Sequence, residues 1–185
     1  ADLGFQREGI VTLPLPGRYD AAKQSTLRQQ LSAISGIENV SLCSQPPASD
    51  NNWYTRIQLE GRAEQEIFEV NMKSQDSRYL ETFGLKILAG RNLEPSDTVR
   101  ELLVNEEMVH KLGFASPEEI LGKKIFEQQD GYPVVGVVKN FNNRSFHEAI
   151  HPQVMMTDAG GFDVCAVALN LQNQKPTMAA VEKVW

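Results

Sequence analysis

Three residues in the last quarter of the chain have the types and the spacing of a zinc site. His147, Glu148 and His151 match the H-E-x-x-H pattern, in which two histidines one helical turn apart bind zinc and the glutamate acts as a general base. Such a site needs a rigid helix beneath both imidazoles and a third ligand from another part of the chain. The chemistry would be zinc-dependent hydrolysis.

The residues around this motif do not supply the helix that it needs. Asn142 and Asn143 precede the motif, and Pro152 follows it directly. The residue before a proline is disfavoured in helical dihedrals, so His151 would lie on a frayed helix end. Glu182 is the only glutamate after the motif that is available as a third ligand. We therefore interpret the match as coincidental, and a zinc-dependent hydrolase stays a remote alternative.

Other catalytic and cofactor motifs are missing from the sequence. It contains no G-x-x-x-x-G-K-[ST] phosphate loop, no G-x-G-x-x-G dinucleotide fingerprint after a strand and no G-x-S-x-G serine elbow. The acidic pairs Glu106-Glu107 and Glu118-Glu119 lie where helices are expected to begin, and capping explains them there. We predict no catalytic, cofactor-binding or metal-binding residue, and we expect that the chain is not an enzyme.

A strand and a polar loop must position the motif. The apolar run from Val134 to Val138 predicts a strand that is covered on both faces, and Gly136 within it predicts a bulge or a close approach of another backbone segment. The loop after this strand is a candidate partner-contact surface, because polar loops on rigid scaffolds often bind partners. A purely structural turn is the alternative. The loop residues are Asn140, Phe141, Asn142, Asn143 and Arg144.

The composition is that of a globular protein without affinity for polyanions. Of the 185 residues, 41% are hydrophobic, and 24 acidic against 18 basic residues give a formal net charge of −6. Phosphate contacts need clustered Lys and Arg, so we exclude nucleic acid as a partner. Cys43 and Cys165 lie far apart, each in an apolar run, which favours two buried free thiols and leaves a disulfide open.

The chain shows no membrane-spanning or targeting segment of its own. No apolar stretch approaches the ~20 residues of a membrane helix, and the first residues do not form a signal peptide. The sequence begins abruptly at Ala1 and ends at Val184-Trp185 inside an expected helix. We expect it to be a segment of a longer protein.

Hydrophobic periodicity and turn residues predict a mixed α+β fold. The chain begins β-α-β and ends β-β-α, so its two ends can join in one layer of sheet and helix, with the middle as an insertion. The expected outer elements are strands at 10–15, 39–43, 153–157 and 162–171, a helix capped by Asp20, and a final helix with Met178, Val181 and Trp185 on one face. The expected inner strands are a hairpin at 55–59 and 67–72, a strand at 85–88, and strands at 125–128 and 132–138 around an Asp130-Gly131 turn. Three short helices are expected between them: one at 77–83 capped by Asp76, one that begins at Asn105, and one from 117 that begins with a capping box of Ser116 and Glu119.

Five short blocks occur in an order and spacing typical of one protein family. The blocks are Gly4-Phe5 with Glu8-Gly9-Ile10, Tyr79 to Arg91, Leu103 to Glu107, Leu121-Gly122-Lys123, and Val134 to Phe141 with His147-Glu148. Together they resemble the MacB-like periplasmic core domain of FtsX-type ABC transporter permeases, most of all the Bacteroidetes-type proteins, over nearly the whole chain. Lys139-Asn140-Phe141 stands where the family commonly has Lys-Asp-Phe, and His151 stands where an acid is common. These departures agree with the absence of a catalytic role.

The resemblance implies two lobes and a place outside the cytoplasmic membrane. Residues 1–46 plus 152–185 would form a porter-like lobe, and residues 47–151 an inserted, Sabre-like lobe. The chain would be the periplasmic domain of an inner-membrane permease, located between its first transmembrane helix and the remaining three. A stand-alone extracytoplasmic ligand-binding or sensor domain is the alternative.

The partners that the resemblance implies follow from this position. The domain would relay ATP-driven motion from a separate cytoplasmic ABC ATPase subunit, through the transmembrane helices of the full-length permease, and would contact a substrate or an envelope partner. The permease would act as a dimer, its further partner being an unidentified substrate or periplasmic adaptor. The resemblance carries over no catalytic residue and no cofactor.

Overall fold

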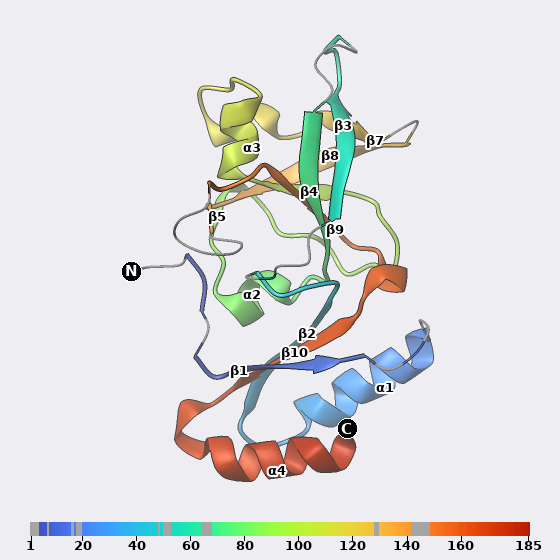
Figure 1. The fold of residues 1–185 in the computed structure, drawn as a ribbon, viewed down its shortest axis with the longest axis vertical. Helices are drawn as coiled ribbons and strands as arrows, with labels where there is room; N and C mark the ends of the chain where they lie inside the picture. Colours follow the sequence, from blue (N-terminus) through green and yellow to red (C-terminus); the bar gives the residue numbers. More distant parts are fainter. Residues whose placement is uncertain are drawn as a thin grey trace.

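The computed structural model describes residues 4–6, 8–15, 17, 20–47, 49, 53–63, 68–127, 130–141 and 149–185. A three-stranded and a seven-stranded sheet follow one another along the long axis of the molecule, with helices at both ends and between the sheets (Figure 1). The predicted mixed α+β class is confirmed. Within the described ranges, no helix is long and apolar enough to cross a membrane.

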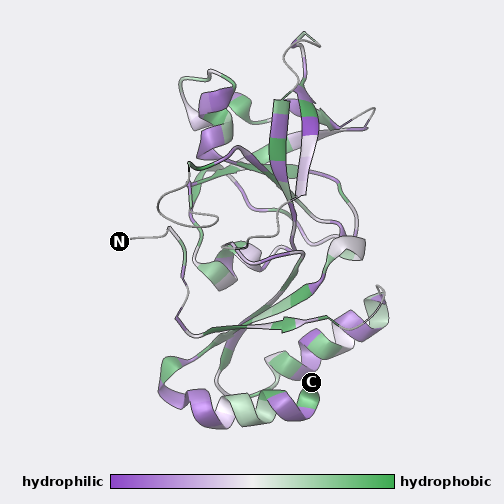
Figure 2. Cartoon of the chain, in the orientation of Figure 1, coloured by the Kyte–Doolittle hydropathy of each residue, from purple (hydrophilic) through white to green (hydrophobic). Residues whose placement is uncertain are grey.

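The three-stranded sheet joins the beginning and the end of the chain. Its strands β1 (Ile10–Pro14), β2 (Ile37–Cys43) and β10 (Val164–Leu169) pair antiparallel in the order β1-β10-β2. Helices α1 (Ala21–Ser32) and α4 (Gln174–Val184) pack against one face of this sheet. Hydrophobic and hydrophilic residues alternate along α4, as expected of a helix with one buried face (Figure 2).

The seven-stranded sheet closes on itself into a barrel. Its strands are β3 (Trp53–Leu59), β4 (Phe68–Ser74), β5 (Ile87–Gly90), β6 (Leu102–Asn105), β7 (Lys124–Glu127), β8 (Asp130–Val138) and β9 (Gln153–Met156). Backbone pairing runs through β8-β6-β9-β4-β3-β7, and β7 then pairs with β8 again. The nine residues of β8 allow this closure, because 130–133 pair with β7 and 134–138 with β6. β5 extends the ring by pairing with the second half of β8.

Short helices cover the barrel and fill the space between the sheets. Helix α2 (Tyr79–Phe83) lies between the two sheets, whereas α3 (Glu106–Lys111) and the 3-10 helix η2 (Pro117–Ile120) pack against the barrel core. The 3-10 helices η3 (Ala159–Gly161) and η4 (Leu171–Asn173) flank β10.

Three hydrophobic cores follow from this arrangement. One fills the barrel, one lies between the sheets around α2, and one lies between the three-stranded sheet and its two helices. Cys43 belongs to the middle core and Cys165 to the core beneath the helices, so the two thiols lie on opposite faces of the same sheet. Both are buried and free, and they do not form the disulfide that the sequence left open.

The close approach predicted at Gly136 is confirmed. A Cβ at this position would lie 2.1 Å from the backbone oxygen of Arg91 and 2.8 Å from the side chain of Leu103. The pairing of β6 with β8 shifts register between Leu102 and Leu103, directly beside this glycine. Only a residue without a side chain fits between these two neighbours.

The predicted turn between β7 and β8 is wrong. Asp130 and Gly131 are the first residues of β8, and Glu127 is paired directly with Asp130. Ile125 is paired with Tyr132, and both belong to the barrel core or pack against it. Because the barrel interior sets this register, Asp130 and Gly131 belong to the strand instead of a turn. Residues 128–129 lie outside the described residues.

The division into residues 1–46 plus 152–185 and 47–151 stays a prediction. Hydrogen bonding places β9, which follows residue 151, in the barrel. It places β1, β2 and β10 in the other sheet.

Candidate functional site

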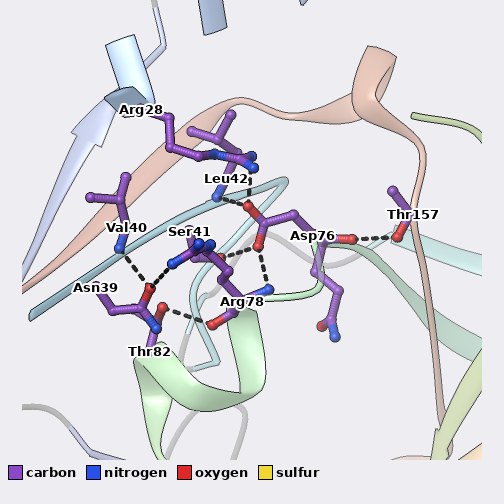
Figure 3. Close-up of polar contacts among 10 residues, drawn as sticks. Arg28, Asn39, Val40, Ser41, Leu42, Asp76, Arg78, Thr82 and Thr157 are labelled. Carbon is purple, nitrogen blue, oxygen red and sulfur yellow. Dashed lines mark hydrogen bonds and ion pairs between the residues drawn. The ribbon is translucent and has the colours of Figure 1, made fainter. Parts of the chain in front are cut away.

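Asp76 is the polar centre of the boundary between the two sheets (Figure 3). It follows β4 and is only 6% exposed. Its Oδ2 accepts hydrogen bonds from Nη2 of Arg28 on α1 and from the backbone N of Leu42 on β2, both at 2.8 Å. Its Oδ1 accepts from the Ser41 hydroxyl at 2.7 Å and from the backbone N of Arg78 at 3.0 Å. One carboxylate therefore joins α1, β2 and the entry of α2, and we call this cluster the joint.

Burial and hydrogen bonding act in opposite directions on Asp76. Burial raises the pKa of its carboxyl group above the ordinary value, whereas the hydrogen bond from Leu42, the charge of Arg28 and the Ser41 hydroxyl lower it. Both oxygens already accept two hydrogen bonds each, so the carboxylate has little capacity left for a ligand. Asp76 therefore suits a structural role, in which it fixes α1, β2 and the entry of α2 relative to one another.

Lys73 and Tyr79 attach the connection between β2 and β3 to strand β4 and helix α2. Lys73 on β4 is fully buried, and its Nζ donates to the carbonyl oxygens of Pro46 and Pro47 at 3.0 Å each. The Tyr79 hydroxyl on α2 donates to the carbonyl oxygen of Gln45, also at 3.0 Å. Burial lowers the pKa of Lys73 to about 8. The chain that leads from one sheet to the other is thus held by side chains from β4 and α2.

A polar cleft of about 440 Å³ opens beside the joint. The first turns of α1 and residues 95–97 form its sides, and Arg28 and Asp76 lie within it. Asp97 is exposed there, and its backbone oxygen accepts a hydrogen bond from Ala159. Among the described residues, no cluster of three histidine, cysteine or acidic side chains could hold a metal ion.

A second cleft, of about 300 Å³, lies at the mouth of the barrel. Its apolar walls include Ile57, Met72 and Val154 from three different strands of the ring. Trp53 at the start of β3 is 53% exposed and contributes an aromatic face. None of the described residues that line this cleft is Lys, Arg or His. The acidic residues that line it are Glu127, Asp130 and Asp158.

Of the three residues of the H-E-x-x-H match, only His151 lies within the described residues. Ala149 and Ile150 before it are not helical, and His151 itself is exposed with its ring edge-on to Tyr54 at 6.2 Å. His147 and Glu148 lie outside the described residues. The described part of the motif therefore lacks the helix that an H-E-x-x-H site uses.

The predicted partner-contact loop is described only at its beginning. Asn140 is bound to α3, because its Oδ1 accepts a hydrogen bond from the backbone N of Glu107 at 2.8 Å. Phe141 is buried in the core between the sheets. Residues 142–144 lie outside the described residues, and the contact surface stays a prediction.

The roles of Asp76 and Lys73 were not predicted from the sequence. Asp76 was expected to cap the helix at 77–83, but α2 begins at Tyr79 with Arg78 as its N-cap, and Asp76 bonds mainly to β2 and α1. Lys73 falls in phase with Glu69 and Asn71 on the polar side of an alternating strand, so nothing in the local pattern signals that it is buried. Neither set of partners is local, so spacing in the sequence does not reveal them.

Solved structures with a similar fold exist, whereas the comparisons of sequence give no match. No protein-family model matches the sequence, and no curated protein matches it. The periplasmic region of MacB from Actinobacillus actinomycetemcomitans matches with a TM-score of 0.66 and 15% identity, over 98% of this chain and 84% of that chain.

Two further structures match over most of the chain. A domain of a Porphyromonas gingivalis protein assigned as a permease has a TM-score of 0.58 and 14% identity, over 91% of this chain and 77% of that chain. The extracellular domain of the ABC-type transporter YknZ from Gram-positive bacteria has a TM-score of 0.58 and 14% identity, over 92% and 86%. At these identities the likeness shows the fold, which is that of a MacB-like periplasmic domain, as the sequence resemblance predicts.

Proposed function

Since this chain has the fold of the MacB periplasmic region, we propose that it is the extracytoplasmic domain of an ABC transporter permease. The observation that carries the proposal is the structural match over 98% of the chain. Two further similar structures are a domain of a protein assigned as a permease and the extracellular domain of an ABC-type transporter. Fold alone does not imply function, so the proposal needs its own test.

In this proposal the domain passes on motion that a separate cytoplasmic ATPase drives through the transmembrane helices of the complete permease. The joint supports this role, because Arg28 of α1 and two groups of β2 bond to Asp76, which follows barrel strand β4. Movement of the three-stranded sheet would then displace the barrel as well. A permease dimer and a substrate or periplasmic adaptor would be its partners.

Accessibility of introduced cysteines in the complete gene product tests the location. Both native cysteines are buried, so they give a low background for a membrane-impermeant maleimide. We expect Glu182→Cys on the exposed side of α4 to react in intact cells, and Val181→Cys, buried on the same helix, to stay unreactive until the protein is denatured. Labelling of Glu182→Cys only after cell lysis would contradict an extracytoplasmic location.

The relay is tested with the complete permease and its ATPase in membranes. Arg28→Met removes the bond from α1 to Asp76 and leaves the three other donors in place. We expect transport per ATP hydrolysed to fall several-fold while the amount of protein in the membrane is unchanged. Lys23→Met, an exposed change on the same helix, is the control. If Arg28→Met and Lys23→Met transport the same amount per ATP hydrolysed, the domain does not relay motion through the joint.

A stand-alone extracytoplasmic ligand sensor is the second candidate function. The cleft at the barrel mouth favours it, because barrel mouths are common ligand sites. Salt and carbonate extraction of membranes that contain the complete gene product separates the two candidates. A permease stays in the membrane, whereas a stand-alone sensor without an anchor is released.

A further inference from the structure

The acidic residues at the barrel mouth break a rule of strand pairing. Glu127 on β7 and Asp130 on β8 are direct partners in the antiparallel pairing, and both line the cleft. Like charges placed directly opposite each other destabilise a sheet. Sequences that break a local rule without a compensating contact often do so at functional sites. Neither carboxylate forms an ion pair with a described residue.

One of these carboxylates is held in a defined position. The Thr55 hydroxyl on β3 donates to Oε1 of Glu127 at 2.6 Å, so three neighbouring strands fix the acidic pair. Oε2 of Glu127 has no hydrogen-bond partner among the described residues. Asp130 is exposed at the rim and also has none there. The pair therefore presents acceptor oxygens toward a cleft that contains no described basic residue.

The remaining walls of the cleft indicate what kind of cation fits. Behind the acidic pair lie Ile57, Met72 and Val154, and the exposed ring of Trp53 stands at the entrance. An apolar wall favours an apolar group, and a tryptophan face favours a cation beside it. The volume of about 300 Å³ is at the lower end of the range for small-molecule sites. The described residues do not offer three clustered ligands for a metal ion.

We propose that the mouth of the barrel binds a small organic cation, namely an amine carried on an apolar or aromatic group. The ammonium lies between Glu127, Asp130 and the face of Trp53, and the apolar group enters the barrel. This site needs neither a permease nor an ATPase, so its failure and the failure of the proposed function are independent.

Binding of 4-phenylbutylamine to the full 185-residue chain tests the proposal. The chain has two tryptophans, and Trp185→Phe leaves Trp53 as the only one, so its fluorescence reports on the mouth directly. We expect saturable quenching with a Kd of about 1 mM or below, and the same Kd from calorimetry. The neutral 4-phenylbutan-1-ol and the anionic 4-phenylbutyrate should bind at least about tenfold more weakly, because the acidic pair attracts only the amine.

A matched pair of variants separates the acidic pair from net charge. Glu127→Gln with Asp130→Asn should weaken amine binding at least about tenfold and leave alcohol binding unchanged. Asp97→Asn with Asp163→Asn removes the same charge from exposed acids that do not line the mouth, and should change the Kd by less than about twofold. Equal binding of amine and alcohol, or equal loss in both double variants, would overturn the proposal. Denaturant unfolding confirms that each variant is folded.

Discussion

The joint and the barrel mouth surround their carboxylates in opposite ways. Asp76 at the joint is buried and accepts hydrogen bonds from four donors, which belong to α1, β2 and the N-cap of α2. Glu127 and Asp130 at the mouth face each other, and among the described residues only the Thr55 hydroxyl binds either side chain. A carboxylate whose acceptor sites are filled by the protein stabilises the fold. Two carboxylates that repel each other beside a cleft lower the stability of the fold, and they can bind a cationic ligand.

The largest expected effect is at the joint. Asp76→Ala should lower the free energy of unfolding by about 3–5 kcal/mol, because Arg28, the Ser41 hydroxyl and the backbone N of Leu42 all lose their acceptor. Urea denaturation measures this change. Asp97→Ala, an exposed acid at the same cleft, should stay within about 0.5 kcal/mol of the wild type. A similar loss in both variants would remove the distinction between buried and exposed acids.

A second effect, at Lys73 beside the joint, depends on pH. Burial lowers the pKa of Lys73 from 10.5 to about 8, so between these values the unfolded chain binds more protons than the folded chain. The free energy of unfolding of the wild type should therefore rise with pH relative to Lys73→Met, by about 3 kcal/mol across this window. Urea denaturation at a series of pH values measures the difference. Lys183→Met on the exposed side of α4 should show no such slope, and a flat difference for Lys73→Met would mean that Lys73 keeps its ordinary pKa.

The smallest effect, of opposite sign, is expected at the mouth. Glu127→Gln removes one of two facing like charges, and the free energy of unfolding should rise by about 0.2–0.5 kcal/mol. The gain should shrink at high salt, since screening already reduces the repulsion. Thermal unfolding at low and high salt measures it, with Glu182→Gln on α4 as the control. A loss of more than about 1 kcal/mol would show that the carboxylate stabilises the fold, as Asp76 does.

Local signals in the sequence predicted local structure well. Asp20 caps α1, and Asn105 caps α3 by accepting a hydrogen bond from the backbone N of Met108 at 3.1 Å. Ser116 and Glu119 form the predicted capping box at η2. These features could be predicted because the interacting groups lie within three or four positions of each other.

The candidate sites could not be predicted in the same way. The partners of Asp76 lie 34 to 48 positions away along the chain for Ser41, Leu42 and Arg28, so no spacing rule connects them. Of the acidic pair at the mouth, Asp130 was expected in a turn, because Asp130-Gly131 has a strong turn preference, and Glu127 in the strand before it. The register of the barrel overrode that preference and placed the two acids opposite each other.

The sequence by itself determined the mixed α+β class, the caps of the short helices, the close approach at Gly136 and the likeness to MacB-like periplasmic domains. Each of these depends on short-range patterns of side chains or on their order along the chain. Only the tertiary structure decided that six strands close into a barrel, that Cys43 and Cys165 lie on opposite faces of one sheet, and which carboxylates are satisfied. Those outcomes depend on which distant strands pair and in which register, and burial and repulsion act only once that pairing has formed.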